Sequence, residues 1–340
     1  MKTPMPAIIG NETLRVRLCQ GVLSHSLPHA FILEGPRGSG KHTLAKMCAA
    51  ALACTEHDNP QLPIPCMRCL SCKKILDGKS PDLITVGTEG KASVGVDAIR
   101  FLKEDIHVIP NDLDYKIYMI EDADRMTVQA QNALLLSLEE PPSYVHFFLL
   151  CENAGALLET IRSRAPILRT EPISKTDLDR YLCEHEPKAK QMKLTSPKEY
   201  AELLQASGAG IGQALEYLRT SSFEPVLEQR TLILDFVDAA VHAKDVLPFL
   251  PRFSAKREPL KEQLSMLGDA MRDLILLKKS ENLTLLFFAD QNVAIELCDC
   301  VSMSFLSRMQ EAVTTAIDDN ARNVNTRLLL MRMLSASQLI

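Results

Sequence analysis

A glycine-rich segment that ends in lysine constrains the fold of this 340-residue chain more than any other feature. It runs from Gly35 to Lys41, with Gly38 and Gly40 between them, and it follows the apolar run 29–33 (HAFIL). An alanine-rich stretch of helical composition comes next. A strand, a glycine loop and a helix in this order predict a phosphate-binding loop, because glycines let backbone N–H groups close around phosphate oxygens. Lys41 is expected to reach the outer phosphates of a nucleotide.

The residue after the lysine departs from this motif. In a phosphate-binding loop that also binds Mg²⁺, a Ser or Thr follows the lysine and its hydroxyl is a metal ligand. His42 stands there, and imidazole is a poor ligand for a hard cation that prefers oxygen. Thr43 carries a hydroxyl, but one residue along a helix rotates the side chain by about 100°. The sequence therefore predicts poor Mg²⁺ binding and leaves open whether ATP or ADP binds.

A second run that predicts a buried strand, 116–120 (KIYMI), is followed by Glu121 and Asp122. In an active P-loop ATPase the first acid at this strand end is usually Asp, which holds Mg²⁺, and the next is Glu, which orients the attacking water. The order is inverted here, and the shorter Asp122 side chain lies about one methylene too far from the water. The sequence thus predicts a degenerate nucleotide site made of Gly35, Gly38, Gly40, Lys41, His42, Thr43, Glu121 and Asp122.

Four of the ten cysteines lie between positions 54 and 72. Cys66, Cys69 and Cys72 form a triplet with two residues between neighbours, and eleven residues separate Cys54 from Cys66. Four thiolates can form a closed tetrahedral zinc site, which is structural because no coordination position is left for water. An iron–sulfur cluster is the alternative. The spacing supports Cys54 as the fourth ligand less strongly than it supports the triplet. The other six cysteines are expected to be small buried apolar residues.

The composition is that of an ordinary globular chain, with 46% hydrophobic and 24% charged residues. No apolar stretch reaches the roughly 18 residues that a membrane span needs, and the first residues lack the apolar core of a signal peptide. We therefore expect a cytoplasmic protein whose cysteines are thiols or metal ligands. The net charge of −5, the lack of Trp and the aromatic content of 5% argue against independent duplex binding and against a base-stacking surface.

Hydrophobic periodicity predicts two kinds of region. Over the first ~165 residues, strand-like and helix-like patterns alternate, which is typical of a parallel sheet with crossover helices. The remainder is helical, since apolar residues recur at three- and four-residue spacing. A proline-containing stretch, 166–176, is interpreted as a linker. The predicted strands are 29–33, 116–120 and 146–150, and the predicted helical segments are 44–53, 126–139, 177–218, 227–241, 260–277 and 327–339.

Two further segments carry a family resemblance. Residues 132–142 (NALLLSLEEPP) resemble the segment NALLKxLEEPP, with Leu136 in place of the usual lysine, and residues 160–165 (TIRSRA) resemble TIxSRC, with Ala165 in place of cysteine. Further matches lie at 9–10, 29–31 and 323–325. Together with the phosphate-binding loop and the cysteine insertion, these segments resemble the AAA+ clamp-loader subunits of bacterial DNA polymerase III, and most closely those of the delta prime type.

The resemblance implies a three-domain subunit. An α/β P-loop (AAA+) domain over 1–168 carries the zinc insertion at about 54–72, a small helical lid domain covers 169–220, and an all-α collar domain over 221–340 mediates oligomerisation. In the family, the arginine of the SRC segment acts in trans on the ATP site of a neighbouring subunit, which implies that Arg164 is an arginine finger. The implied partners are subunits of the gamma/tau and delta types in a hetero-oligomeric ring, the sliding clamp, and primed DNA reached through the complex.

Four departures from the motor subunits of this family imply a weak or absent ATPase. They are His42, the order Glu121-Asp122, residues 151–153 (CEN) at the sensor 1 position, and Gly212 at the arginine position of sensor 2 within 208–215. Because Arg164 is kept, the resemblance implies a stator that helps to load the clamp during replication. It would belong to the polymerase holoenzyme without intrinsic activity. Two alternatives stay open: an active gamma/tau-type motor subunit, and a zinc-containing P-loop protein that binds nucleotide outside replication.

Overall fold

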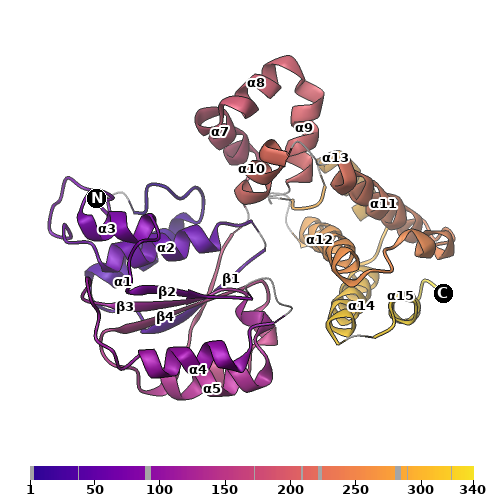
Figure 1. Cartoon of the computed structure of the whole chain (residues 1–340). Helices are drawn as coiled ribbons and strands as arrows, with labels where there is room; N and C mark the ends of the chain where they lie inside the picture. Colours follow the sequence, from indigo (N-terminus) through magenta and orange to yellow (C-terminus); the bar gives the residue numbers. More distant parts are fainter. Residues whose placement is uncertain are drawn as a thin grey trace. The chain divides into compact units, whose positions relative to one another are not determined.

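The structure is a computed structural model that describes residues 4–36, 38–88, 93–171, 173–207, 210–220, 224–279, 285–288, 290–322 and 324–340. The chain divides into two compact units, Met1–Ile173 with Gly210–Gly212, and Ser174–Ala209 with Gln213–Ile340 (Figure 1). Four residues of the sequence motifs, Arg37, Gly208, Ala209 and Asn323, lie outside the described residues.

The first unit is built on a five-stranded sheet in which all neighbouring strands are parallel. The strand order is β2-β3-β4-β1-β5. This confirms the predicted parallel α/β architecture. The strands are β1 (Ala30–Glu34), β2 (Leu83–Val86), β3 (Lys116–Ile120), β4 (Val145–Cys151) and β5 (Ile167–Arg169). Because βα crossovers place helices on both faces of such a sheet, its central strands are buried on both sides and read as continuous apolar runs.

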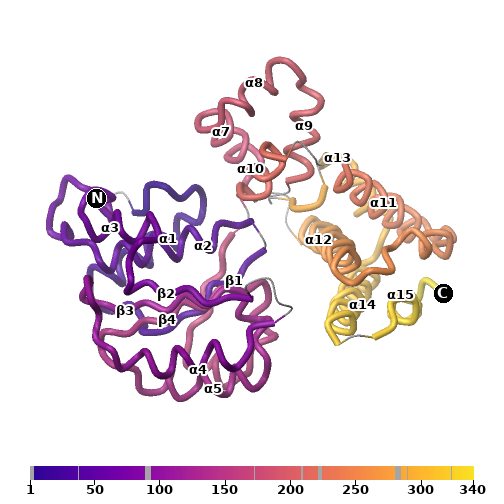
Figure 2. The backbone as a smooth tube through the Cα atoms, in the orientation of Figure 1, coloured from indigo at the N-terminus to yellow at the C-terminus, as the bar shows by residue number. Residues whose placement is uncertain are grey.

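Two helical layers cover the sheet. One face packs against α1 (Glu12–Leu23), α2 (Lys41–Leu52) and α3 (Leu70–Leu76), and the other packs against α4 (Val96–Asp105) and α5 (Val128–Glu139). Figure 2 shows α4 and α5 side by side along the sheet. Alternate strand residues serve the two cores: Phe31 stacks on Phe148 at 4.4 Å between ring centroids on the first face, and Tyr118 stacks on Phe147 at 5.3 Å on the second.

Three features of the first unit differ from the sequence predictions. Part of the predicted linker 166–176 is a strand, because β5 pairs with β1 at the sheet edge. Strand β2 was not predicted, since a strand of four residues is too short to show a clear periodicity. Helices α1, α3 and α4 and the short helix α6 (Glu159–Arg162) were also not predicted. The prediction of a linker was therefore wrong for residues 167–169, where tertiary pairing sets the conformation of a segment too short to show a pattern.

The second unit is helical throughout its described residues. The predicted helical periodicity at 227–241, 260–277 and 327–339 falls on α11, α12 and α15. The division of this unit into a lid and a collar stays a prediction. The helices are α7 (Lys175–His185), α8 (Pro187–Thr195), α9 (Pro197–Ala206), α10 (Ile211–Thr220), α11 (Glu224–Val241), α12 (Arg257–Lys279), α13 (Gln291–Asp299), α14 (Met303–Ala321) and α15 (Thr326–Ala336).

Three helices of this unit are joined through hydrogen bonds to the short segment 285–288, one set of which involves a buried carboxylate. Asp273 on α12 is fully buried, and its oxygens accept the backbone N–H groups of Leu286 at 3.0 Å and Phe287 at 2.8 Å. The carbonyl oxygens of the same short segment accept hydrogen bonds from Arg230 on α11 and from Lys175 on α7. Residues 285–288 are thus held between α7, α11 and α12.

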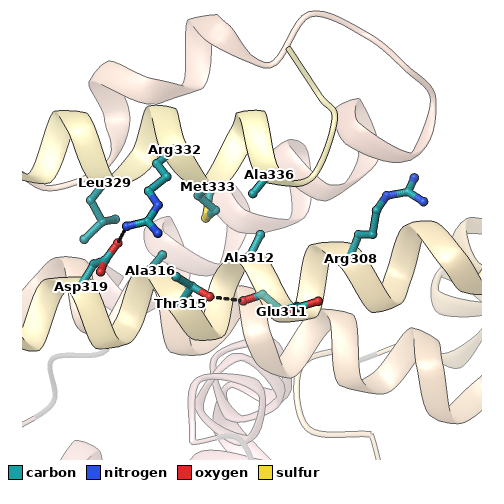
Figure 3. Close-up of a pocket in the computed structure, with 10 residues that line it drawn as sticks. All are labelled: Arg308, Glu311, Ala312, Thr315, Ala316, Asp319, Leu329, Arg332, Met333 and Ala336. Carbon is teal, nitrogen blue, oxygen red and sulfur yellow. Dashed lines mark hydrogen bonds and ion pairs between the residues drawn. The ribbon is translucent and has the colours of Figure 1, made fainter.

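A shallow groove of about 350 Å³ runs between α14 and α15 (Figure 3). Its floor contains Ala312, Ala316 and Ala336. Arg332 on α15 donates from Nη1 to Asp319 Oδ2 on α14 at 2.9 Å, as Figure 3 shows. This ion pair links the two helices across the groove, and small residues allow the helices to approach closely.

His146 on β4 should make the first unit sensitive to acid. Burial lowers the pKa of its imidazole to about 4, whereas a histidine in an unfolded chain titrates near 6.5. Between these values the unfolded chain gains a proton that the folded chain does not bind, so the free energy of unfolding falls as the pH falls. The loss across this window is about 3 kcal/mol at most.

We expect His146→Phe to remove most of this pH dependence, because the buried ring already contacts aromatic neighbours and a phenyl ring does not titrate. Urea unfolding at pH 7 and pH 4.5 measures it. His107→Gln is the control, since His107 is exposed. If the free energy of unfolding of His146→Phe depended on pH as strongly as that of the wild-type chain, His146 would not be the source of the acid sensitivity.

Candidate functional site

The loop between β1 and α2 has the backbone that its glycines make possible. Gly38 and Gly40 have φ angles of +79° and +84°, in the left-handed region that favours glycine. At Gly35 a Cβ atom would lie 1.9 Å from Thr170 Oγ1, so no other residue fits beside β5. The loop leads directly into the N-terminus of α2, which begins at Lys41. The predicted strand–loop–helix context is therefore present.

The lysine of the loop is bound to the loop itself. Lys41 Nζ donates to the carbonyl oxygens of Gly35 at 2.7 Å and Pro36 at 2.8 Å. Burial lowers the pKa of the Lys41 ammonium, while nearby acidic groups, of which Glu152 is the strongest, act in the opposite direction. In this arrangement the ammonium stabilises the closed loop.

His42 and Glu121, two of the residues that depart from the motif, contact each other. His42 Nε2 lies 2.6 Å from Glu121 Oε1. This hydrogen bond and the charge of His42 lower the pKa of the Glu121 carboxyl. The imidazole occupies the position after the lysine, where a hydroxyl ligand of Mg²⁺ is expected. The pair therefore joins the helix that follows the loop to the end of β3.

The second acid of the strand end and the second helical hydroxyl do not join this pair. Asp122 adopts a φ of +48°, and its Oδ2 accepts a hydrogen bond from Thr88 Oγ1 at 3.1 Å. Thr43 is exposed on α2. The structure thus brings His42 and Glu121 together and leaves Asp122 and Thr43 apart from them.

Two acidic residues near the loop were missed by sequence reasoning. Asp124 Oδ2 accepts the backbone N–H groups of Glu152 at 3.2 Å and Asn153 at 3.3 Å, and burial raises the pKa of its carboxyl. Glu34, at the end of β1, accepts the N–H of Ala154 at 2.8 Å. Both carboxylates hold the segment after β4, and the only sequence signal was that each closely follows a buried strand.

The side chains of residues 151–153 are poor ligands for a phosphate group. Burial raises the pKa of the Cys151 thiol to about 12, so the thiol stays protonated. Asn153 Oδ1 accepts the backbone N–H of Gly155 at 2.8 Å and caps the following turn. Gly212, at the predicted arginine position, lies in the first turn of α10 and has no side chain to reach a nucleotide.

The cysteine cluster forms as predicted. The Sγ atoms of Cys54, Cys66, Cys69 and Cys72 all lie within 4.8 Å of one another, and those of Cys66 and Cys72 are 3.9 Å apart. Two zinc–sulfur bonds of about 2.3 Å at a tetrahedral angle place the sulfurs about 3.8 Å apart. The four thiols therefore fit a tetrahedral metal site, consistent with zinc. Three of them are buried and Cys69 is partly exposed.

Backbone N–H groups point at the sulfurs of this cluster. Cys66 Sγ accepts from the N–H of Cys69 at 3.3 Å, and Cys69 Sγ accepts from the N–H of Cys72 at 3.4 Å, at the start of α3. Hydrogen bonding from Cys72 lowers the pKa of the Cys54 thiol to about 4. Donors of this kind favour thiolates, which are the forms that bind metal. The chain before α1 secures the insertion, since Met5 N donates to Ile64 O at 2.7 Å.

The remaining six cysteines follow the prediction only in part. Cys19, Cys48, Cys151 and Cys298 are buried. The prediction of burial was wrong for Cys300, which is exposed after the end of α13, and for Cys183, which is partly exposed on α7. Helix ends and amphipathic faces admit cysteine without burying it.

Arg164 lies just after the short helix α6 (Glu159–Arg162). Its Nη2 donates to Glu139 Oε1 at 2.6 Å, and its Nη1 donates to the carbonyl oxygen of Thr160 at 3.0 Å. The arginine side chain is 35% exposed. The neighbouring Ile161 and Ala165 are fully buried. A guanidinium is thus presented at the surface on a segment that is anchored on both sides.

A parallel α/β sheet, a glycine loop between β1 and α2, and acids at the end of β3 are the elements of a P-loop fold, and they resemble those of the AAA+ class. Residues 10–174 match the family described as "DNA polymerase III, delta subunit". This match and the relatives below support a clamp-loader subunit of bacterial DNA polymerase III.

Relatives with three subunit names are similar to this chain over part of its length. The tau subunit of Bacillus subtilis is 33% identical over 157 residues, which cover 46% of this chain and 27% of that protein. The delta' subunit of Bacillus subtilis is 32% identical over 197 residues, 58% of this chain and 56% of that protein. The gamma subunit of Buchnera aphidicola is 31% identical over 175 residues, which cover 52% of this chain and 47% of that protein. The chain thus spans about a quarter to just over half of the length of these relatives.

A DNA polymerase III gamma subunit-related protein from Thermotoga maritima covers 95% of this chain and 98% of its own at 19% identity. Its TM-score with this chain is 0.41. Within the described residues, none of the helices is long and apolar enough to cross a membrane.

Proposed function

We propose that this chain is a delta prime-type subunit of the clamp loader, a stator that presents Arg164 to the ATP site of an adjacent motor subunit. The observation that carries the proposal is that residues of the chain's own nucleotide site bind one another. Lys41 is bound to its own loop, and His42 pairs with Glu121 at 2.6 Å. Both groups are bound at the place where nucleotide phosphates and Mg²⁺ bind in an active site.

Sequence identity does not separate this proposal from the gamma/tau alternative, because the tau, delta' and gamma relatives are 33%, 32% and 31% identical. The site residues favour the stator. A motor subunit needs a hydroxyl ligand for Mg²⁺ after the lysine and a free carboxylate at the end of β3. Here His42 stands at the first position, and its imidazole forms a hydrogen bond with the Glu121 carboxylate at the second.

In this role the chain would join gamma/tau and delta type subunits in a hetero-oligomeric ring that loads the sliding clamp onto primed DNA. The helical second unit would supply the lid and the collar. The alternative of a P-loop protein outside replication makes a different prediction, since such a protein would not co-purify with the other loader subunits.

We further propose that the four clustered cysteines bind one zinc ion. The sulfur positions, the burial and the N–H donors described above support a closed four-sulfur site. When bound, the ion would supply structural stability only, because a closed site leaves no position for a reacting water. Cys54 closes the end of α2 onto the triplet, so the ion would cross-link the insertion to the main fold.

The isolated chain should hydrolyse ATP no faster than a buffer blank when Mg²⁺ is present. The reasons are the His42–Glu121 pair, the position of Asp122 and the lack of a side chain at Gly212. A phosphate-release assay measures this, with an active motor subunit as the positive control.

His42→Ser should not restore turnover, because the other losses persist. Hydrolysis by the isolated chain at the rate of a motor subunit would refute the stator proposal and favour the gamma/tau alternative.

A further inference from the structure

Glu139 contacts Arg164 from a different helix. The contact between Arg164 Nη2 and Glu139 Oε1 is 2.6 Å long, which is short even for a charge-assisted hydrogen bond. Arg164 Nη1 donates to the carbonyl of Thr160 at 3.0 Å and lies 3.4 Å from Ser163 Oγ. The guanidinium therefore has a defined position, although both side chains of the pair are partly exposed.

The position of Glu139 disfavours a carboxylate on local grounds. Glu139 is the last residue of α5, and Glu140 and Pro141 follow it. The C-terminus of a helix carries partial negative charge, so a carboxylate there is repelled unless a cation lies nearby. The last turn of α5 contains no basic residue. Arg164 supplies that cation from outside the helix, so the location of Glu139 is explained by Arg164 and not by the stability of α5.

A second contact fixes the segment that carries Arg164. Gln131, near the start of α5, is buried; its Oε1 accepts the N–H of Leu158 at 2.7 Å, and its Nε2 donates to Met126 O at 3.1 Å. Ile161 and Ala165 are fully buried under the same segment. Residues 158–165 are therefore attached to α5 at one end by Gln131 and at the other by Glu139.

We propose that Glu139 is a positioning residue for Arg164 in the reaction of the neighbouring subunit. This rests on the proposed function. The contacts above use both N–H groups of Nη1 and one of Nη2, which leaves Nε–H and the second N–H of Nη2 for a phosphate oxygen. A guanidinium that is already oriented loses less conformational entropy when it meets the γ-phosphate than a free one does. Glu139 thus lowers the entropic cost of placing the Arg164 guanidinium against the γ-phosphate.

The test is ATP turnover by a loader reconstituted with gamma/tau and delta type subunits, primed DNA and this full-length chain. Glu139→Ala should cause at least half of the loss in kcat that Arg164→Ala causes, with the KM for ATP changed less than twofold. Glu139→Gln should be intermediate, because its amide oxygen still accepts a hydrogen bond. In the Arg164→Ala background, Glu139→Ala should add nothing, since it acts through the arginine. A change of fold alone would add to the Arg164→Ala loss.

Glu140→Ala is the matched control, since Glu140 is the adjacent, exposed acid, and it should leave kcat unchanged. Wild-type turnover in Glu139→Ala, with a loss in Arg164→Ala, would overturn the positioning role and leave the proposed function standing. Faster turnover in Glu139→Ala would also overturn it, because the carboxylate would then withhold the finger. No loss in Arg164→Ala would overturn both. If Glu139→Ala fails to assemble, the Glu139→Gln result decides.

Discussion

Removal of the metal is expected to unfold the cysteine insertion and to leave the sheet of the first unit in place. The purified chain should contain one zinc per molecule, and a strong chelator should release it. Structural zinc contributes about 10–16 kcal/mol in zinc-finger peptides, and the insertion at about 54–72 is too short to bury a core of its own. Hydrogen exchange should therefore rise in residues 54–76 after chelation, while the amides of β1, β3 and β4 stay protected.

Cysteine variants separate the ligands from bystanders. Cys72→Ser should abolish zinc retention, because Cys72 is fully buried in the cluster. Cys300→Ser is the control and should keep one zinc, since that thiol is exposed in the second unit. Unchanged zinc content in Cys54→Ser would remove Cys54 from the ligand set, and absence of zinc from the native chain would refute the site.

Arg164→Ala is expected to lower the ATP turnover of the assembled loader while this chain still folds and assembles. An arginine finger contributes about 10³–10⁵ in rate at the site it serves. A loader has more than one active site, so total turnover should fall by a fraction, unless the sites fire in strict sequence. The fold should survive because Arg164 is partly exposed and its buried neighbours Ile161 and Ala165 are unchanged. A DNA-stimulated phosphate-release assay with the reconstituted complex measures this.

Two variants define the chemistry at this position. Arg164→Lys should be nearly as damaging as Arg164→Ala, because an ammonium cannot present the planar fork of a guanidinium. Arg162→Ala should have little effect, since Arg162 is an exposed residue on the short helix that precedes Arg164. A loss in Arg162→Ala with normal turnover in Arg164→Ala would show that the family segment is aligned in the wrong register.

The elements that the sequence predicted best are those that tertiary structure buries on both sides. Strand β3 has the predicted bounds, 116–120, because all five of its residues are buried and residues 117–120 are a continuous run of large hydrophobic side chains. The loop from Gly35 to Lys41 was predictable for a different reason, since its φ angles and the approach of Thr170 admit only glycine at fixed places. The cysteine cluster was predictable from spacing, because a turn and one helical turn bring the triplet together.

The rest depended on contacts between residues distant in sequence. The spacing of Glu139 and Arg164 does not predict their ion pair, which arises because α5 and α6 pack together. The same holds for His42 and Glu121: the sequence marks each as a departure from its motif, and only the adjacency of α2 and the end of β3 joins them. Strand β5 is too short to carry a pattern and forms by pairing with β1.

The most direct test of the stator account compares two variants of this chain in the reconstituted loader. Lys41→Ala alters its own phosphate-binding loop, and Arg164→Ala removes the proposed finger. DNA-stimulated ATP turnover is measured for each against the wild-type complex. The account predicts near-normal turnover with Lys41→Ala and a clear loss with Arg164→Ala. The opposite pattern, a loss with Lys41→Ala and normal turnover with Arg164→Ala, would show that this chain works as a motor and would contradict the account.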